Sequence, residues 1–444
     1  DGFECRTLRL CRQVLLFHHF PDEAQLGGSP VLVKRVVLEY QTLRNGVNLL
    51  LATHEHAIDR HGRISSLPPF ECLYQKGDLK LDTARFQRLE DFPGLNDGQR
   101  YHLVDLYGEG LPGILYRSDK AWYYREPQRA ESAAADEVSY GTARKIPAIP
   151  TADSAYPMHQ QLTDVTGDGR LDWVSGRPGL RGFFSLSAQL NWSGFIGFDA
   201  LPQEYFHPDA VFGDLMGRGN NDLALVGPRS VRLYANRQHA GFAPGVDVPH
   251  APADDALPTV SRSNREWVGF SDVLGSGQQH LVRIRHDRIE CWPNLGRGRF
   301  GKGFVLANLP FDHETFDAAH VVLADLDGYG GADLLYLTPD ELRIFSNQGG
   351  NRFDITPRVL SWPEGVRYDA LSQVSLADLN GLGCPSLIIS VMHPQPRHWR
   401  YDFYIDRPYL LAYTTHHLGN RSRVFYRSSA QEWLDEKKQC RDQG

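Results

Sequence analysis

The stretch HVVLADLDGYGGADLLYLTPDELRIF, residues 320–345, decides the fold. An unbroken apolar run ends at Asp325, the chain passes Gly328 and Gly330, and a second apolar run follows. An Asp carboxylate can accept hydrogen bonds from loop N–H groups two or three residues on, and glycine adopts positive φ at no steric cost. The stretch therefore predicts a tight hairpin between two strands that are buried on both faces.

The same turn recurs six times along the chain. Successive Asp residues lie 59, 50, 58, 53 and 53 residues apart. Repeats of about 55 residues, each with four short strands, predict an all-β fold, a six-bladed β-propeller at residues 98–417. The residues to which we assign a structural role in these turns are Asp105, Gly108, Gly110, Asp164, Gly167, Gly169, Asp214, Gly217, Gly219, Asp272, Gly275, Gly277, Asp325, Gly328, Gly330, Asp378, Gly381 and Gly383.

A second recurring mark supports the register of the repeats. Asn236, Asn294 and Asn347 each lie 22 residues after the Asp of their unit, and each precedes a glycine-bearing turn and a Phe. The fifth unit shows its strands most clearly, and we expect them at 320–326, 332–337, 341–346 and 352–360. The fourth strands of the third and fourth units are expected at 242–248 and 299–306.

Residues 1–97 lack the repeat and form a predicted β-rich flanking region. This region could form a small sandwich, and one of its strands is a candidate to close the ring. Its strand-like runs lie at 6–20, 31–40, 48–58 and 70–74.

The remaining segments interrupt or follow the repeats. Residues 126–150 are expected to form a loop or insertion in the first unit, and residues 393–400 a loop in the sixth. Residues 418–444 contain a strand and a predicted helix at 428–438, with Ser428 or Ser429 as N-cap and Glu432 near the capping-box position. We expect this helix to lead into another domain.

Composition and charge exclude several classes of function. The net charge of −7 combines well-mixed charges of both signs, which argues against a nucleic-acid surface. No apolar stretch of about 18 residues is present that could span a membrane. The six cysteines are scattered without a CxxC pair, so we expect free thiols, with one incidental disulfide as the alternative.

Calcium binding by the repeat turns is the first possible chemical function. Two of the six turns carry enough oxygen ligands, one with Asp164, Asp168 and Asp172, the other with Asp325, Asp327 and Asp333. The other four turns keep the glycines but lack the carboxylates, which favours a turn-forming role. We therefore predict no metal and no cofactor, with calcium at the two turns as the alternative.

Catalysis finds little support in the sequence. The histidine pairs His18-His19, His54 with His56, and His416-His417 have no third ligand fixed by local spacing, so we expect surface histidines. No G-x-S-x-G motif and no acid–base constellation occurs. The sequence therefore predicts a protein that is not an enzyme.

Three long phrases carry a resemblance to a known family. They are RTLRLCRQVLLFHHFPDE at 6–23, YHLVDLYGEGLPGILYRSDKAWYYRE at 101–126 and RPYLLAYTTHHLGNRSRVFYRSSAQEWLDEK at 407–437. These stretches resemble the B subunit (TcB) of bacterial insecticidal toxin complexes, the Tc toxins. The resemblance extends over essentially the whole chain and matches the middle of that subunit, between its SpvB-like region and its RHS/YD repeats.

The resemblance implies both an architecture and a function. It implies an integrin-like propeller with FG-GAP-like turns, which docks onto the pentameric A subunit (TcA) and closes the cocoon that holds the toxic C subunit. The chain would then be a non-catalytic docking and gating propeller of a secreted, extracellular virulence complex. A carbohydrate- or cell-surface-binding propeller is one alternative. An ADP-ribosyltransferase, which the SpvB name suggests, is another, but no Glu-x-Glu pair occurs.

Gating requires a place where the ring can open. The first and sixth units depart most from the repeat, with Gly113 and Ser386 where three other units have Asp. These two units are neighbours in a closed ring. We therefore expect blades one and six, with the adjoining N-terminal strands, to form the labile side that rearranges on docking.

Overall fold

A computed structural model describes residues 9–22, 29–89, 101–118, 121–130, 136–147, 160–187, 191–261 and 263–443. The chain divides into two compact units. The propeller unit comprises Leu79–Ile405 with Arg427–Gly444, and the sheet unit comprises Glu4–Asp78 with Asp406–Tyr426. These limits differ from the predicted boundaries. The predicted start of the propeller, after residue 97, lies outside the described residues. Its predicted end was residue 417, whereas the chain enters the sheet unit at Asp406.

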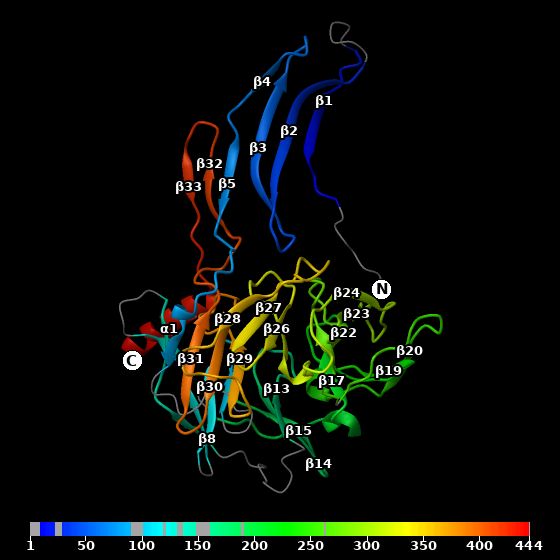
Figure 1. The fold of residues 1–444 in the computed structure, drawn as a ribbon, viewed down its shortest axis with the longest axis vertical. Helices are drawn as coiled ribbons and strands as arrows, with labels where there is room; N and C mark the ends of the chain where they lie inside the picture. The colour runs from blue at the N-terminus through cyan, green and yellow to red at the C-terminus, as the bar shows by residue number, and fades with distance from the viewer. Residues whose placement is uncertain are drawn as a thin grey trace. The chain divides into compact units, whose positions relative to one another are not determined.

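Six four-stranded antiparallel sheets make up the propeller unit, so the predicted six-bladed β-propeller is confirmed (Figure 1). Blade one contains β7 (Tyr101–Val104), β8 (Gly113–Ser118), β9 (Ala121–Arg125) and β12 (Arg144–Ile146), and blade two contains β13 (Gln160–Thr163), β14 (Asp172–Arg177), β15 (Leu180–Ser185) and β16 (Ile196–Gly197). Blade three contains β17 (Ala210–Gly213), β18 (Asp222–Val226), β19 (Ser230–Tyr234) and β20 (Val246–Pro249), and blade four contains β21 (Glu266–Ser271), β22 (His280–Arg285), β23 (Arg288–Trp292) and β24 (Phe304–Asn308). Blade five contains β25 (Val321–Ala324), β26 (Asp333–Leu337), β27 (Glu341–Phe345) and β28 (Arg358–Ser361), and blade six contains β29 (Ser372–Ala377), β30 (Ser386–Val391), β31 (Arg397–Asp402) and β6 (Gln87–Leu89).

Strand β6 closes the ring. It pairs with β31, placing His398 opposite Leu89 and Arg400 opposite Gln87. Because β6 precedes blade one in the chain but completes blade six, the two ends of the ring are joined inside one sheet. The prediction that a strand from before the repeats closes the ring is confirmed.

Apolar side chains fill the space between neighbouring blades. Ile284 and Leu334 belong to the buried cluster between blades four and five. Similar clusters lie between the other consecutive pairs. Between blades six and one, the buried members are Ile114, Leu379 and Ile388. Each blade therefore hides both of its faces against its neighbours, which explains the unbroken apolar runs of the inner strands.

The fourth strands of three blades begin later than predicted. β20, β24 and β28 start several residues beyond Phe242, Phe300 and Phe353, which form isolated bridges to Asn236, Asn294 and Asn347. The three Phe side chains are buried. The apolar signal at these positions therefore reports the core between blades and not the start of a strand.

The described residues of the sheet unit form one antiparallel sheet, not a sandwich. Its strands in spatial order are β1 (Gln13–His18), β2 (Val31–Thr42), β3 (Asn48–Ile58), β5 (Phe70–Tyr74), β32 (Leu411–Thr415) and β33 (Arg421–Arg423), and β4 (Ile64–Ser66) pairs with β3. The sequence could not show this arrangement, because β32 returns from the far end of the chain to pair with β5.

The segment predicted as an insertion in blade one contains a small hairpin. Strands β10 (Pro127–Arg129) and β11 (Val138–Tyr140) pair with each other, and the chain then returns to the blade as β12. Short 3-10 helices lie at η1 (Thr83–Arg85), η3 (Gln203–Phe206), η4 (Gln238–Ala240) and η5 (Ala318–His320).

Helix α1 (Ser429–Gln443) belongs to the propeller unit. Ser428 caps it, because the Gln431 N–H donates to the Ser428 hydroxyl at 3.3 Å. The prediction that Ser428 or Ser429 starts a helix here is confirmed. In the described part of the chain, no helix is both long and apolar enough to cross a membrane.

Candidate functional site

The six repeat turns share one hydrogen-bond pattern. In every turn one Asp oxygen accepts the N–H of the second glycine, at 2.6–2.9 Å. In five turns the other oxygen accepts the N–H of the residue before that glycine, and in blade two it accepts the N–H of Gly167. The bonds thus reach up to five residues along the chain. Bonds with the predicted reach of two or three residues occur, for example from Tyr107 and Gly167. Other bonds reach four or five residues, because the glycines curl the loop back toward the carboxylate.

Both glycines of every repeat turn have positive φ, from 64° at Gly275 to 111° at Gly330. Residues with a Cβ rarely adopt this conformation. The predicted backbone conformation is therefore confirmed in all six turns. We also predicted that the eighteen turn residues have a structural role and bind no ligand, and this stays a prediction.

In blades three, four and five a second polar side chain, eight residues after the Asp, ties the turn to the outer part of the blade. In blade three, Asp222 accepts the N–H groups of Leu215 and Met216 with one oxygen and that of Asn236 with the other. Asp333 repeats this in blade five with Leu326 and Asn347. In blade four, His280 Nδ1 accepts the Asn294 N–H at 2.9 Å. Sequence reasoning missed this role, since it read Asp172 and Asp333 only as calcium candidates.

Burial shifts the acidity of these carboxyls. It raises the pKa of Asp222 and of Asp172 above the usual range and raises that of Asp333 well above it. In the turn of blade five, burial first and then the neighbouring Asp327 raise the pKa of Asp325 to about 6, against the lowering effect of the Gly330 N–H. The hydrogen bonds therefore only partly offset the loss of solvation.

The recurring Asn connects neighbouring blades. Asn347 Nδ2 donates to the Ala332 carbonyl of its own blade at 3.0 Å and to the Val273 carbonyl of blade four at 2.9 Å. Asn236 likewise donates to the Val165 carbonyl of blade two at 3.1 Å. One side-chain amide thus fastens a blade both internally and to the blade before it.

Blade one departs from this arrangement at both positions. It has Gly113 in place of the buried carboxylate, and a Cβ there would lie 2.3 Å from the Tyr124 hydroxyl, so the Tyr124 ring fills the space. Twenty-two residues after Asp105 it has Pro127 instead of Asn. A proline has no side-chain amide. Blade one therefore cannot fasten itself to blade six as blades three and five fasten themselves to their neighbours.

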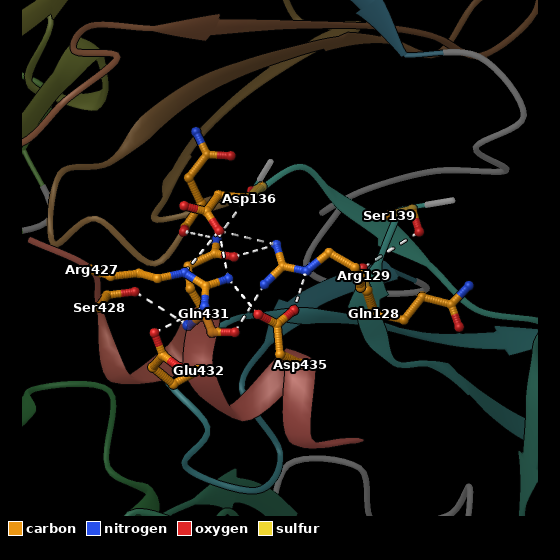
Figure 2. Close-up of polar contacts among 10 residues, drawn as sticks. Gln128, Arg129, Asp136, Ser139, Arg427, Ser428, Gln431, Glu432 and Asp435 are labelled. Atoms are coloured by element: carbon orange, nitrogen blue, oxygen red, sulfur yellow. Dashed lines mark hydrogen bonds and ion pairs between the residues drawn. The ribbon is translucent and has the colours of Figure 1, made fainter. Parts of the chain in front are cut away.

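Helix α1 contacts the β10–β11 hairpin (Figure 2). It also contacts the turns of blades one and six. Gln431 is only 2% exposed and lies at the centre of the contact. Its Nε2 donates to the Asn380 carbonyl in the turn of blade six at 2.6 Å and to the Asp136 carbonyl in the β10–β11 hairpin at 3.1 Å. The amide of Gln431 thus connects blade six with the hairpin inserted in blade one.

Charged groups surround this bridge. Arg129 of β10 donates to the Gln431 side chain and carbonyl, and to Asp435 at 2.8 Å. Arg427 pairs with Asp136 at 2.7 Å and also with Asp435 (Figure 2). Arg427, and then Arg129, hold the pKa of Asp435 below its usual range.

Two further ion pairs extend the contact along the helix. Lys437 pairs with Glu109 in the turn of blade one at 2.6 Å. Arg441 pairs with Glu126 at 3.1 Å. These charges connect successive turns of α1 to blade one.

The described residues form no metal site and no disulfide. They contain no group of three or more His, Cys, Asp or Glu side chains that could hold a metal ion. Cys11, Cys72, Cys291, Cys384 and Cys440 are free thiols, as predicted, whereas Cys5 lies outside the described residues. His54 contacts Glu39, and His56 contacts Ser66, both on the sheet unit.

Solved structures of Tc toxins are similar to this chain over its whole length. A chain of the Photorhabdus luminescens Tc holotoxin pore is 42% identical with a TM-score of 0.90, and the match covers 100% of this chain and 20% of that one. The crystal structure of TcdB2-TccC3 is 40% identical with a TM-score of 0.71, covering 100% of this chain and 21% of that one. The chain therefore spans about a fifth of the length of the toxin chains it matches.

A shorter similarity links the chain to another toxin. The mono(ADP-ribosyl)transferase SpvB of Salmonella typhimurium is 69% identical over 39 residues, which are 9% of this chain and 6% of that protein. A comparison with protein-family models found no match.

Proposed function

We propose a docking and gating role without catalysis for this chain, which corresponds over its whole length to a segment of the Tc toxin B subunit. The propeller would bind the pentameric A subunit (TcA) and control the exit of the toxic C subunit from its cocoon, within a secreted toxin complex. The observation that carries the proposal is the 42% identity to a holotoxin chain across all 444 residues.

The absence of catalysis is part of the proposal. The SpvB similarity covers too little of this chain to carry that protein's activity with it. The sequence contains no Glu-x-Glu pair. The polar side chains of the repeat turns are occupied with backbone N–H groups, which leaves them unsuited to act on a substrate.

We further propose which end of the propeller docks. The repeat turns lie at one end of the blades, where α1 covers part of blades one and six. The opposite end, here called the hairpin end, is built from residues 227–229, 286–287 and 338–340 and from the connections 309–320 and 362–371. These loops differ in length and sequence from blade to blade, and such loops provide specificity on a rigid scaffold.

Binding to a purified A pentamer tests the function. The chain, immobilised on a sensor, is expected to capture the pentamer, whereas a panel of glycans is not captured. Glycan binding without pentamer binding would overturn the docking proposal and favour a carbohydrate-binding propeller.

A pair of substitutions near blade five tests the docking end. Arg367→Glu changes the charge at the hairpin end, where Arg367 is 68% exposed beside Asp340. Arg352→Glu makes the same change in the exposed loop at the turn end. We expect the first to weaken pentamer binding by about tenfold and the second to leave it unchanged. The reverse result would place docking at the turn end while keeping the function.

A further inference from the structure

We propose that α1 is a clasp that holds blades six and one together, and that the ring opens at this seam when the helix is released. The name "seam" here means the contact of blade six with blade one, including Leu379, Ile388 and Ile114. The closure itself is inferred from contacts within the propeller unit. Its use as a gate rests on the proposed function.

The first argument is the missing bridge. Asn236 and Asn347 each connect a blade to the blade before it through one buried amide. Blade one has Pro127 at the matching position, and blades two and six have Leu186 and Arg400, so these three blades lack the amide. Gln431 supplies an amide at this seam, connecting Asn380 of blade six with Asp136 of the hairpin inserted in blade one. The helix thereby supplies from outside the repeat what the repeat itself lacks.

The second argument is the close fit of the helix to both turns. Leu434 and Ala430 are buried with Leu111 of blade one. A Cβ on Gly381 of blade six would lie 2.9 Å from the Ala430 Cβ, and one on Gly110 of blade one 3.4 Å from the same atom. Ala430 therefore sits against the turns of both blades, and at Gly381 only glycine leaves the necessary room.

The third argument is the polarity of the contact, which makes it reversible. The apolar part is small, and much of the rest consists of ion pairs such as Arg129 with Asp435 and Lys437 with Glu109. Removing the charge of one partner leaves the other partner without its counter-charge, so a change of charge can break this contact, whereas it would not break an apolar core. The clasp can thus detach while the six blades keep their own cores.

Hydrogen–deuterium exchange of the whole chain tests the clasp. Gln431→Ala removes the bridging amide and the bond from Arg129 to its side-chain oxygen. We expect about ten- to hundredfold faster exchange in β29 and β30 of blade six and in β7 and β8 of blade one. Strands β22 and β26, in blades four and five, should keep their protection. The matched control is Lys438→Ala, on the exposed side of the same helix, which should change no strand.

Exchanging the charges of one ion pair distinguishes a lost contact from misfolding of the variant. Glu109→Lys and Lys437→Glu should each accelerate exchange at the seam, whereas the double variant should restore it, because the pair is re-formed with reversed signs. Faster exchange in α1 alone, with the exchange of blades six and one unchanged, would overturn the proposal, because the helix would then not hold the blades together. Equal acceleration in all six blades, or no rescue in the double variant, would overturn it as well.

Discussion

A side-chain amide bridges the blades at two places that differ in where the amide comes from. These places are the junction between blades four and five and the seam between blades six and one. At the first, the bridging amide belongs to Asn347, inside blade five itself. At the second, it belongs to Gln431, on a helix outside the repeat. The first junction forms whenever its blades fold. The second depends on a separate element, so we expect that it can open while both blades stay folded.

The two regions also differ in the direction of their charge effects. Around blade five, buried carboxyls have a raised pKa because their charge is poorly solvated. On the clasp, Asp435 has a lowered pKa because Arg427 and Arg129 stabilise its charge. Acid therefore favours the first region and disfavours the second.

The largest expected contrast comes from truncating one leucine in each region. Leu334→Ala empties a fully buried position between blades four and five and should lower the free energy of unfolding by about 2–5 kcal/mol. Leu434→Ala in α1 should leave global unfolding nearly unchanged, because the helix detaches first. Urea denaturation midpoints measure both effects. Equal losses for the two variants would break the comparison.

A pH effect of intermediate size is expected in blade five. The pKa of Asp325 is raised to about 6, so its contribution to stability is full below the usual carboxyl range and is lost as the pH rises through about 6. Asp325→Asn should reduce this loss between pH 4.5 and 7.5 by about 1–2 kcal/mol, allowing for solvent screening. Melting curves at the two pH values measure it. The control is Asp378→Asn, which removes the same turn hydrogen bonds in blade six, and an equal change there would contradict the assignment to Asp325.

The clasp should respond to acid in the opposite sense. Because the pKa of Asp435 is lowered, its contribution is present above the usual carboxyl range and is lost as the pH falls through the lowered pKa. Helix α1 should therefore detach more readily at pH 3 than at pH 5. Exchange rates corrected for intrinsic pH dependence measure this, and Asp435→Asn should remove most of the difference. Unchanged protection of α1 across this range would show that the ion pairs do not hold it.

The smallest expected effect is that of calcium. If the turns hold no metal, the melting temperature should not change with calcium, in either the parent chain or Asp164→Ala. A cation at 1,000 times its Kd would add about 4 kcal/mol of stability. A clear calcium-dependent rise that is lost in Asp164→Ala or Asp325→Ala would restore the calcium interpretation of these turns.

The sequence was sufficient for features that repeat. The spacing of the Asp and glycine residues predicted the six blades, and both glycines of each turn have the expected positive φ. The recurrence of Asn236, Asn294 and Asn347 was recognised, but its physical reason, an amide that reaches the preceding blade, needed coordinates. The buried group eight residues after each Asp could have been found from its recurrence at Asp222 and Asp333.

Features that occur only once could not be predicted from the sequence. Gln431 contacts Asp136 and Asn380, which lie 295 and 51 residues away in the chain, so no local pattern marks them as partners. The helix belongs to the propeller unit, which the sequence did not indicate, and that it leads into another domain stays a prediction. Strand β32 was assigned to the propeller but pairs with β5 in the sheet unit. Single long-range contacts of this kind leave no periodic signal.

Native-state hydrogen exchange of the unmodified chain tests the central claim most directly. Under mild denaturant, each strand reports the free energy of the opening that exposes it. If α1 clasps a weak seam, α1 should lose protection first, followed by β29–β31 and β7–β9, while β21–β27 exchange only through global unfolding. Uniform protection around the ring, or earliest opening centred on blade four, would contradict the account.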